Sequence, residues 1–330
     1  MDLSIVIVNW NSTGCLLDCL ASIENTTRDI EHEIIVVDNA SVDEPLRLIS
    51  ETFPSVRLIR SDLNLGFARA NNLGSDFALG DKILFLNPDT LILGNGISLM
   101  VTLMDSDPRI GILGCRLLNP DLSLQISAIQ PFPTIFNQLI TLHSLKRRWP
   151  QLPMWGMRSF LSDETNGVHE AEVVGGACLM IKKDIFKSVG RFSTEYFLYA
   201  EEMDLCRKVA DSGWRVCRAS NSKVIHLGGQ STKKMGSAFS HVVMRESVFK
   251  LLRKFRGRTY AQTYRCALFL SAAARVAVLL PLQTVPLRSL DRERVLYAYE
   301  KWRRIASWCL SLEGWSKKLV ITASDGEAKN

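Results

Sequence analysis

The sequence predicts an α/β protein with a mostly parallel, mixed sheet, helices on both faces of that sheet, and a helical C-terminal extension. Short runs rich in Ile and Val alternate with helix-length segments through the first hundred residues, as expected of parallel strands buried on both faces. Beyond about residue 236 the pattern becomes helical and basic. The expected division is a sheet domain over residues 1–235 and a helical, basic region over residues 236–330. A chain of 330 residues, 47% of them hydrophobic, is long enough for both.

The first series of elements is defined by runs of aliphatic residues. Four strands are expected, at Ser4–Val8, Glu33–Val37, Val56–Ile59 and Lys82–Leu86. Between them, apolar residues at helical spacing predict helices over Cys15–Ile23 and Asn71–Ala78. Together these segments form a βαβ series.

Prolines separate this series from a second one. Between about Asn119 and Val168 they stand at positions 120, 131, 133, 150 and 153 and predict loops and short elements. Regular patterns then return as a strand, a helix and a short strand, expected at Val173–Ile181, Met203–Asp211 and Lys223–His226.

Charge is concentrated near the C-terminal end. The net charge of +6 is modest, with 34 acidic residues against 40 basic ones, so nucleic-acid binding is not indicated. From Ser247 to Leu290, however, there are eight Lys or Arg and no acid. This stretch predicts contact with an anionic membrane surface, where each cation contributes about 1 kcal/mol. The alternative is that Val242–Phe255 is an ordinary amphipathic helix packed on the domain.

An apolar run, Cys266–Leu282, lies inside the basic stretch. Its 17 residues fall short of the about 20 that a membrane span needs, and Arg275 stands at its centre. An interfacial or core helix is therefore favoured over a span.

Cysteine usage and the N-terminus bear on location. The eight cysteines show no C-x-x-C spacing, which argues against a zinc ribbon or a disulfide scaffold and favours reduced thiols. The chain runs from Asp2 directly into a strand pattern, without the features of a secretory signal. We therefore expect a cytoplasmic protein, peripheral at the inner face of the cytoplasmic membrane if the basic stretch binds there.

Polar residues follow three of the predicted strands. They are Asn9, Asp38 and the tripeptide Asn87-Pro88-Asp89. An aspartate in such a place often caps a turn, but ligands of open α/β sheets bind beyond the carboxyl ends of the strands. Asp89 is the best candidate metal ligand, because a hard dication that bridges a diphosphate prefers carboxylate oxygen.

A second group of acids opens the predicted helix at Met203–Asp211. Glu201, Glu202 and Asp204 stabilise a helix N-terminus through its dipole, or one of them is a general base whose basicity is raised by partial burial beside aromatic residues. His226 ends the last short strand. It is either structural or a second ligand for a metal held by Asp89.

These residues lie in blocks that resemble the family 2 glycosyltransferases, in particular the bacterial rhamnosyltransferase-like branch that builds cell-surface polysaccharides such as O-antigen. Seven blocks occur in order over roughly Leu3 to Ser231: SIVIVNWN, EIIVVDNASVD, NLGFARANNLG, ILFLNPDT, VVGGACLMIKKDIFKSVGRF, FLYAEEMDLCRK and VIHLGG. The resemblance implies a GT-A, Rossmann-like fold and transfer of a sugar with inversion. A divalent metal, Mg²⁺ or Mn²⁺, is the implied cofactor.

The resemblance also implies roles for individual residues. Asp38 is expected to contact the nucleobase, Asp89 and His226 to hold the metal and diphosphate, and Glu202 to act as base. The remaining residues expected to bind substrate are Asn9, Asn64, Gly66, Arg69, Asn71, Asn87 and Gly176. The implied donor is dTDP-L-rhamnose, with a glycan or lipid-linked oligosaccharide as acceptor.

The sequence departs from the family pattern at two positions. Asn87 stands where the D-x-D motif has a first carboxylate, and Glu202 stands where the base is usually Asp. Glu201 and Asp204 therefore remain alternatives for the base. Other readings are a transferase for a UDP- or GDP-hexose and a sugar-nucleotide-binding module without turnover. A nucleotide-dependent oxidoreductase is disfavoured because no G-x-G-x-x-G follows a strand.

Overall fold

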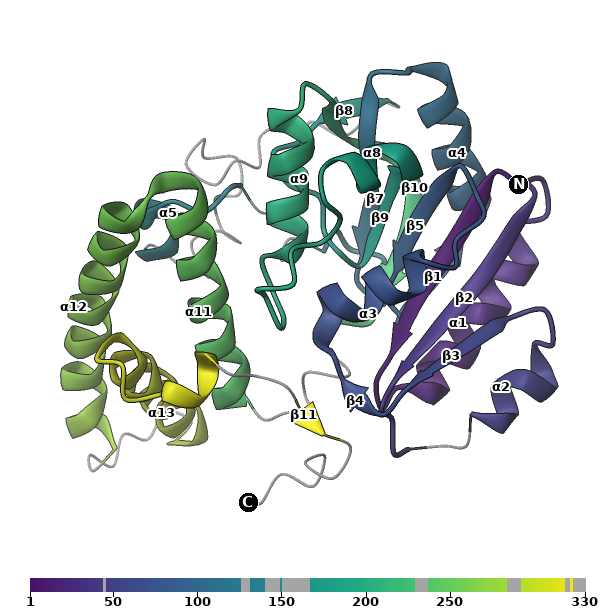
Figure 1. Cartoon of the computed structure of the whole chain (residues 1–330). Helices are drawn as coiled ribbons and strands as arrows, with labels where there is room; N and C mark the ends of the chain where they lie inside the picture. The colour runs from purple at the N-terminus through teal and green to yellow at the C-terminus, as the bar shows by residue number, and fades with distance from the viewer. Residues whose placement is uncertain are drawn as a thin grey trace.

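The computed structural model describes residues 1–43, 46–125, 131–139, 149, 167–228, 237–283, 292–317 and 321–322. Within them a nine-stranded sheet has the order β3-β2-β1-β5-β9-β7-β10-β6, with β8 paired to β10 (Figure 1). The strands are β1 (Leu3–Asn9), β2 (His32–Asn39), β3 (Arg57–Ser61), β5 (Lys82–Leu86), β6 (Thr90–Leu93), β7 (Ile110–Leu118), β8 (Val168–Glu170), β9 (Cys178–Lys182) and β10 (Arg215–His226).

The sheet is mixed, as predicted. The strands β1, β2, β3 and β5 are parallel neighbours, and β7 is parallel to β10. The strand β9 is antiparallel to both β5 and β7, and β10 is antiparallel to β6 and β8. Because β5 and β9 are antiparallel, β9 begins at the edge where β5 ends, with Cys178 opposite Leu86.

Helices cover both faces of the sheet. In β1, Ile5 and Ile7 belong to one core cluster and Val6 to another, as the two-residue side-chain period of a strand requires. The first cluster includes residues of α1 (Thr13–Thr26), α2 (Arg47–Thr52) and α4 (Gly96–Ser106). The second includes residues of α3 (Gly66–Ser75), α8 (Lys183–Ser188) and α9 (Glu201–Asp211).

The C-terminal region is helical, as predicted. Its helices are α11 (Ser237–Arg256), α12 (Arg258–Leu282) and α13 (Arg292–Cys309), which share a third core with the short α5 (Ile135–Leu139) (Figure 1). A short 3-10 helix, η3 (Gly314–Lys317), follows, and β11 (Ile321–Thr322) pairs with β4 (Leu63–Asn64). The predicted boundary at residue 235 lies outside the described residues.

One helix, α11, connects the two regions. Leu251 belongs to the second core of the sheet domain. The Ser247 hydroxyl donates to the Leu198 carbonyl oxygen at 2.7 Å, and the Lys250 ammonium donates to the Glu195 carbonyl oxygen at 2.9 Å. This helix therefore packs on the loop that leads into α9.

Three predicted elements differ clearly from the structure. The short strand expected at Lys223–His226 is the end of the 12-residue β10 (Arg215–His226). The strand expected over Val173–Ile181 begins at Cys178, because Val173 and Val174 are buried in a turn-rich segment rather than in the ladder. The helix expected over Asn71–Ala78 begins at Gly66 and ends at Ser75. A buried apolar run forms either a strand or a packed loop, and burial does not distinguish the two. The strand predicted at Val173–Ile181 therefore started too early.

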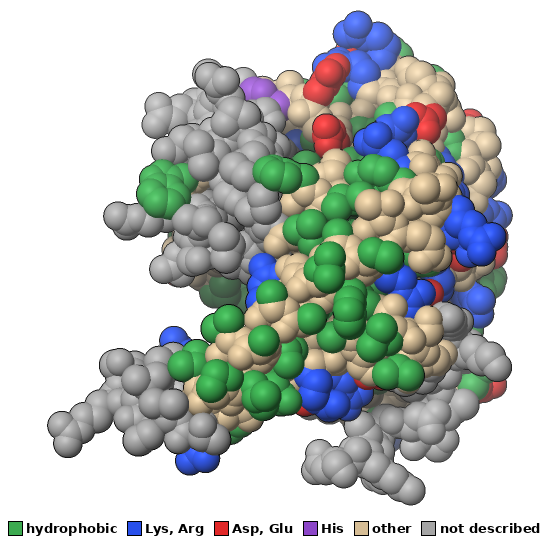
Figure 2. Space-filling model, turned by 90° about the vertical axis from the view of Figure 1, so that its left-hand side faces the viewer, with side chains coloured by type: hydrophobic (Ala, Val, Ile, Leu, Met, Phe, Trp, Pro, Cys, Tyr) green, Lys and Arg blue, Asp and Glu red, His purple; other side chains and the backbone are tan. Residues whose placement is uncertain are grey.

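The helix α12 has an unusual exposure. Within the described residues it is the one helix long and apolar enough to cross a bilayer, and only 11% of its most apolar 18-residue stretch is buried. Leu270, Val278 and Leu280 are more than half exposed. Figure 2, which views the molecule from the side of α12, shows apolar side chains gathered on this face. Such a buried fraction is too small for a core helix.

Candidate active site

The ends of β1 and β2 form the first part of the site. Asn9 and Asp38 face each other in the parallel register and are both buried. The Asn9 amide nitrogen lies 3.4 Å from an Asp38 carboxylate oxygen and 3.2 Å from the Ser41 hydroxyl. The next two turns contain Asn11 and Ala40, whose φ values of 51° and 65° are unusual for residues other than glycine. Strained backbone of this kind concentrates at functional sites.

The segment before α3 is held by side-chain amides. Asn64 is buried, and its Oδ1 accepts hydrogen bonds from the Asn39 amide at 2.9 Å and from the Gly66 N–H at 3.0 Å. Asn71 is also buried, with its amide donating to the Phe67 carbonyl oxygen. Both amides thus support the loop, whereas Arg69, on α3, is exposed.

Gly66 joins this loop to the one before α9. Its φ is +74°, and a Cβ added there would lie 2.3 Å from the Phe197 carbonyl oxygen. The same oxygen accepts a hydrogen bond from the Phe67 N–H at 3.0 Å. Only glycine at position 66 allows this backbone segment to approach that of Phe197 so closely. The role of Gly66 is therefore in packing.

The turn after β5 presents Asn87 and Asp89. The Asn87 carbonyl oxygen accepts a hydrogen bond from the Thr90 hydroxyl at 2.8 Å and a weaker one from the Cys19 thiol at 3.8 Å. Burial raises the pKa of Cys19 to about 12, so this thiol stays protonated. These contacts fix the turn. The Asp89 side chain, at the surface of the turn, is 8% exposed.

His226 meets this turn from the end of β10. Its Nε2 lies 3.4 Å from the Asp89 carboxylate and 3.3 Å from the Asn87 amide nitrogen. The other ring nitrogen, Nδ1, lies 2.8 Å from Oε1 of Gln125, while Nε2 of Gln125 donates to the His226 carbonyl oxygen at 2.9 Å. Because Oε1 accepts, Nδ1 carries the proton. The lone pair of Nε2 is thereby directed to the side of Asp89, where a metal ligand needs it.

Glu202 lies beside the same edge. A Cβ added to Gly176 would be 3.6 Å from the Glu202 Cβ and 3.7 Å from the Phe67 ring. The next residue, Ala177, accepts a hydrogen bond through its carbonyl oxygen from the Asn87 N–H at 2.9 Å. The backbone next to Gly176 is thus hydrogen-bonded to the Asn87 turn, and Gly176 itself lies close to Glu202.

The start of α9 raises the basicity of its acids. Tyr199 and Ala200, just before it, have φ values of 69° and 70°. Burial raises the pKa of Glu202 from 4.5 to about 7. Burial, followed by the charge of Glu202, raises the pKa of Glu201 well above its ordinary value. Desolvation thus outweighs the helix dipole, which alone would favour the ionised forms.

Asp204 has a different environment from its two neighbours. Its side chain is fully buried and accepts hydrogen bonds from the Ser193 hydroxyl at 2.5 Å and the Tyr196 hydroxyl at 3.3 Å. It also forms ion pairs with Lys208 at 3.3 Å and with Lys254 of α11 at 2.5 Å. A carboxylate with four partners and no exposure has no room for a substrate hydroxyl.

Two residues of this arrangement were not expected from the sequence. Gln125 orients His226, and Phe197 provides the backbone carbonyl that Gly66 approaches. Gln125 carries no motif, since a lone glutamine in a proline-rich stretch gives no periodic or spacing signal, and Phe197, which opens the block FLYAEEMDLCRK, acts here through its backbone. Within the described residues, no group of three or more His, Cys, Asp or Glu is placed to hold a metal ion.

Comparison with known proteins identifies the family. The family model for glycosyl transferase family 2 matches residues 4–190. The N-acetylglucosaminyl-diphospho-decaprenol L-rhamnosyltransferase of Mycobacterium tuberculosis is 28% identical over 244 residues, which cover 70% of this chain and 77% of the relative. The rhamnosyltransferase WbbL of Escherichia coli K12 is 23% identical, over 65% of this chain and 80% of the relative.

Solved structures agree on the fold. The mannosyltransferase PcManGT of Pyrobaculum calidifontis, in complex with GDP-Man and Mn²⁺, superposes with a TM-score of 0.57 at 16% identity, over 96% of this chain and 88% of that one. GalNAc-T7 with UDP, GalNAc and Mn²⁺ gives 0.57 at 15% identity, over 96% and 57%. The family match and this architecture confirm the GT-A fold class, and the chain belongs to glycosyl transferase family 2 as a glycosyltransferase enzyme.

Proposed function

We propose that this enzyme moves a sugar from a nucleoside diphosphate, with inversion, onto a hydroxyl of a glycan or lipid-linked acceptor. The observation that carries the proposal is that the Ala177 and Gly176 backbone brings the turn with Asp89 and His226 near Glu202, whose carboxyl group has a raised pKa. The Asp89 and His226 pair suits a metal-bound diphosphate, and Glu202 suits a base. Cell-surface polysaccharide synthesis is the setting that the names of the relatives support.

Asp89 and His226 would hold the divalent metal, Mg²⁺ or Mn²⁺. The neighbour with GDP-Man carries Mn²⁺, and the Asp89 oxygen and His226 Nε2 lie 3.4 Å apart, which suits two ligands of one ion. When bound, the metal neutralises charge on the leaving diphosphate. Two protein ligands, with Asn87 in place of a second carboxylate, leave most coordination positions to phosphate and water. Metal affinity should therefore depend strongly on bound nucleotide.

Glu202 would act as the base. In one displacement the acceptor oxygen forms a bond to the anomeric carbon. The bond from that carbon to the diphosphate oxygen breaks, and its electron pair stays on the diphosphate. The acceptor proton moves to the Glu202 carboxylate. A pKa of about 7 suits a base near neutral pH. Glu201 lies deeper and is the weaker candidate, and Asp204 is engaged by two lysines.

The donor site would lie on the rim that Asn9 and Asp38 form. Asp38 is the proposed nucleobase contact, and Arg69, exposed on α3, is free to approach the nucleotide. The names of the two rhamnosyltransferases support dTDP-L-rhamnose as donor. Asn64, Asn71 and Gly66 would act indirectly, by fixing the loop that borders the nucleotide.

The acceptor would be presented at a membrane. The exposed residues of α12 are polar at its start, and those from Cys266 to its end are all apolar. Arg275 does not interrupt that surface, because its guanidinium stacks on the Trp302 ring at 4.2 Å and donates to the Leu139 carbonyl oxygen. The apolar face in Figure 2 could thus rest in the interfacial layer at the inner side of the cytoplasmic membrane.

A thermal-shift screen tests the donor and metal together. The purified chain is heated with dTDP-L-rhamnose, UDP-glucose or GDP-mannose, each with and without Mn²⁺. A ligand at 100 times its dissociation constant stabilises by about 2.7 kcal/mol, so the proposed donor should raise the melting temperature by several degrees only when Mn²⁺ is present. A shift given by another donor alone, or by none, would reject this donor assignment.

A further inference from the structure

A cavity of about 460 Å³ lies between α11 and α12, on the side of α11 away from the sheet domain. Its lining contains four basic residues, Lys250, Arg253, Arg258 and Arg265, with a single acid, Glu246. Phe249 and Gln262 complete the lining. None of these residues belongs to the active site described above.

Most of this positive charge is not compensated. Arg253 and Arg258 are exposed and form no ion pair or hydrogen bond in the described part of the chain. Arg265 donates to the Trp308 and Cys309 carbonyl oxygens at 2.6 and 2.8 Å, which are neutral partners. The one acid, Glu246, accepts from the Trp308 indole at 2.9 Å and lies 4.0 Å from Lys250. Three guanidinium charges therefore remain without an acid.

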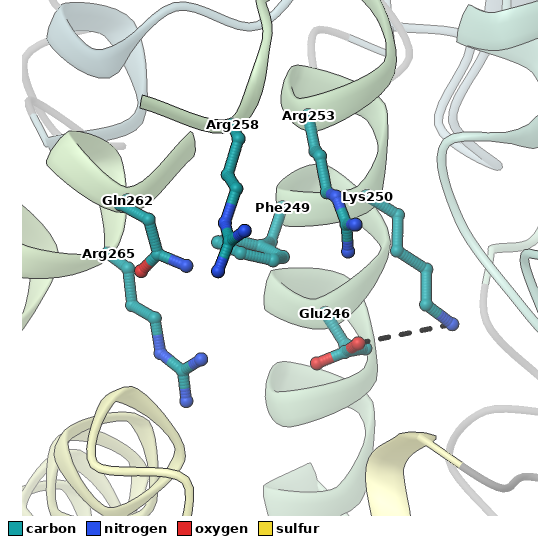
Figure 3. Close-up of a pocket in the computed structure, with 7 residues that line it drawn as sticks. All are labelled: Glu246, Phe249, Lys250, Arg253, Arg258, Gln262 and Arg265. Atoms are coloured by element: carbon teal, nitrogen blue, oxygen red, sulfur yellow. Dashed lines mark ion pairs between the residues drawn. The ribbon is translucent and has the colours of Figure 1, made fainter. Parts of the chain in front are cut away.

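The geometry directs two of these charges, those of Arg253 and Arg258, to one place. Figure 3 shows the guanidinium groups of Arg253 and Arg258 reaching from different helices into the space near Phe249. Arg258 is the first residue of α12, and Arg253 lies in the last turn of α11. Like charges gathered in this way repel one another unless an anion lies between them.

We propose that this cavity binds a phosphate or diphosphate group. A guanidinium binds phosphate through two parallel hydrogen bonds, so Arg253 and Arg258 together match a ligand with several charged oxygens better than the two oxygens of a carboxylate. The group comes either from a soluble diphosphate or from a lipid headgroup. The second source rests on the proposed function, since it would anchor the phosphate end of a membrane lipid beside the apolar face of α12.

The cavity also has a route to the active site. Lys250 lines it and donates to the Glu195 carbonyl oxygen, in the loop that precedes α9. Lys254, one turn further along α11, pairs with Asp204 inside α9. The helix that lines the cavity is therefore also bound to the loop and the helix that position Glu202.

Calorimetric titration of the full chain with pyrophosphate tests the site. The buffer contains EDTA and little salt, so that the metal-dependent donor site does not bind the probe. We expect saturable binding that weakens at least about tenfold in the double variant Arg253→Gln/Arg258→Gln. The control Arg256→Gln/Arg292→Gln removes the same charge from exposed positions outside the cavity and should bind within about twofold of wild type. No saturable binding, or equal loss in both variants, would overturn the proposal.

Vesicle flotation separates the two sources of phosphate. Phosphatidylcholine vesicles are compared with vesicles that also contain phosphatidic acid. Loss of phosphatidic acid binding in the cavity variant but not in the control assigns a lipid headgroup, whereas equal flotation of both assigns a soluble ligand. Hydrolysis of dTDP-L-rhamnose with Mn²⁺ should be unchanged in both variants. A failure of the donor proposal would appear in this hydrolysis assay, whereas a failure of the cavity proposal would appear in the pyrophosphate titration.

Discussion

Gln125 binds His226 through both ends of its amide, with Oε1 2.8 Å from the ring Nδ1 and Nε2 2.9 Å from the His226 carbonyl oxygen. These two contacts fix both the rotation of the imidazole and the position of its proton. The consequence is that, in the neutral imidazole, Nε2 is the nitrogen that keeps a free lone pair, on the side of Asp89. A side chain outside every sequence block thus orients the histidine that we propose as a metal ligand.

Replacing Gln125 should therefore weaken the metal site. In Gln125→Leu the ring loses its orienting partner, and Mn²⁺ affinity measured by electron paramagnetic resonance with dTDP present should fall about 10- to 100-fold. The control Gln262→Leu makes the same chemical change on α12 and should leave Mn²⁺ affinity unchanged. Equal affinity in both variants would show that Gln125 does not position the ligand.

The rate of transfer should rise with pH through about 7. Burial raises the pKa of Glu202 to about 7, so at lower pH the carboxyl group is protonated and cannot accept the proton of the acceptor. The logarithm of the rate should increase with a slope of about one between about pH 5.5 and 7 and then level off. A rate that is flat or falls over that range would exclude a base with this environment.

Gly66→Ala should destabilise the fold more than other glycine substitutions. It combines a φ of +74° with a Cβ placed 2.3 Å from the Phe197 carbonyl oxygen, and the strain alone costs about 1 to 3 kcal/mol. Gly94→Ala has the positive φ but open space, and Gly14→Ala has open space within helix α1. Chemical denaturation should rank stability as Gly14→Ala, then Gly94→Ala, then Gly66→Ala. Any order that places Gly66→Ala above Gly94→Ala contradicts the close approach.

Asp204→Asn should unfold more easily but still transfer sugar. It removes the charge that pairs with Lys208 and Lys254, and breaking a buried ion pair costs about 3 to 5 kcal/mol. Asp211→Asn, at the exposed end of the same helix, should cost less than about 1 kcal/mol. Activity per folded molecule, measured well below the melting temperature, should stay within about tenfold of wild type. Complete loss of activity in folded protein would make Asp204 a candidate base again.

The sequence was most informative where one physical rule decides the outcome. A short aliphatic run such as Lys82–Leu86, bounded by turn residues, favours a buried strand, and the structure places β5 at those bounds. Parallel strands put their carboxyl ends on one edge, so the proximity of Asn9 and Asp38 follows from the pattern alone. The antiparallel β9 between β5 and β7 did not follow, because pairing between distant strands leaves no local signal.

The three acids of α9 show where such prediction ends. The sequence places Glu201, Glu202 and Asp204 together on one helix start, but their roles differ through residues far away in the chain. Lys254, 50 positions later, neutralises Asp204, while Gly176 leaves space beside Glu202. Gln125 is a similar case, 101 positions from the histidine it holds. These assignments depend on tertiary contacts, which composition and spacing do not contain.

The most direct test of the account is turnover by Glu202→Gln. Release of dTDP from dTDP-L-rhamnose is measured with Mn²⁺ and a membrane lipid extract as acceptor, beside the control Glu195→Gln in the preceding loop. We predict that Glu202→Gln lowers turnover by about 100- to 10,000-fold while dTDP binding with Mn²⁺ stays within about twofold of wild type. Turnover by Glu202→Gln equal to that of the control would contradict the assignment of Glu202 as the base.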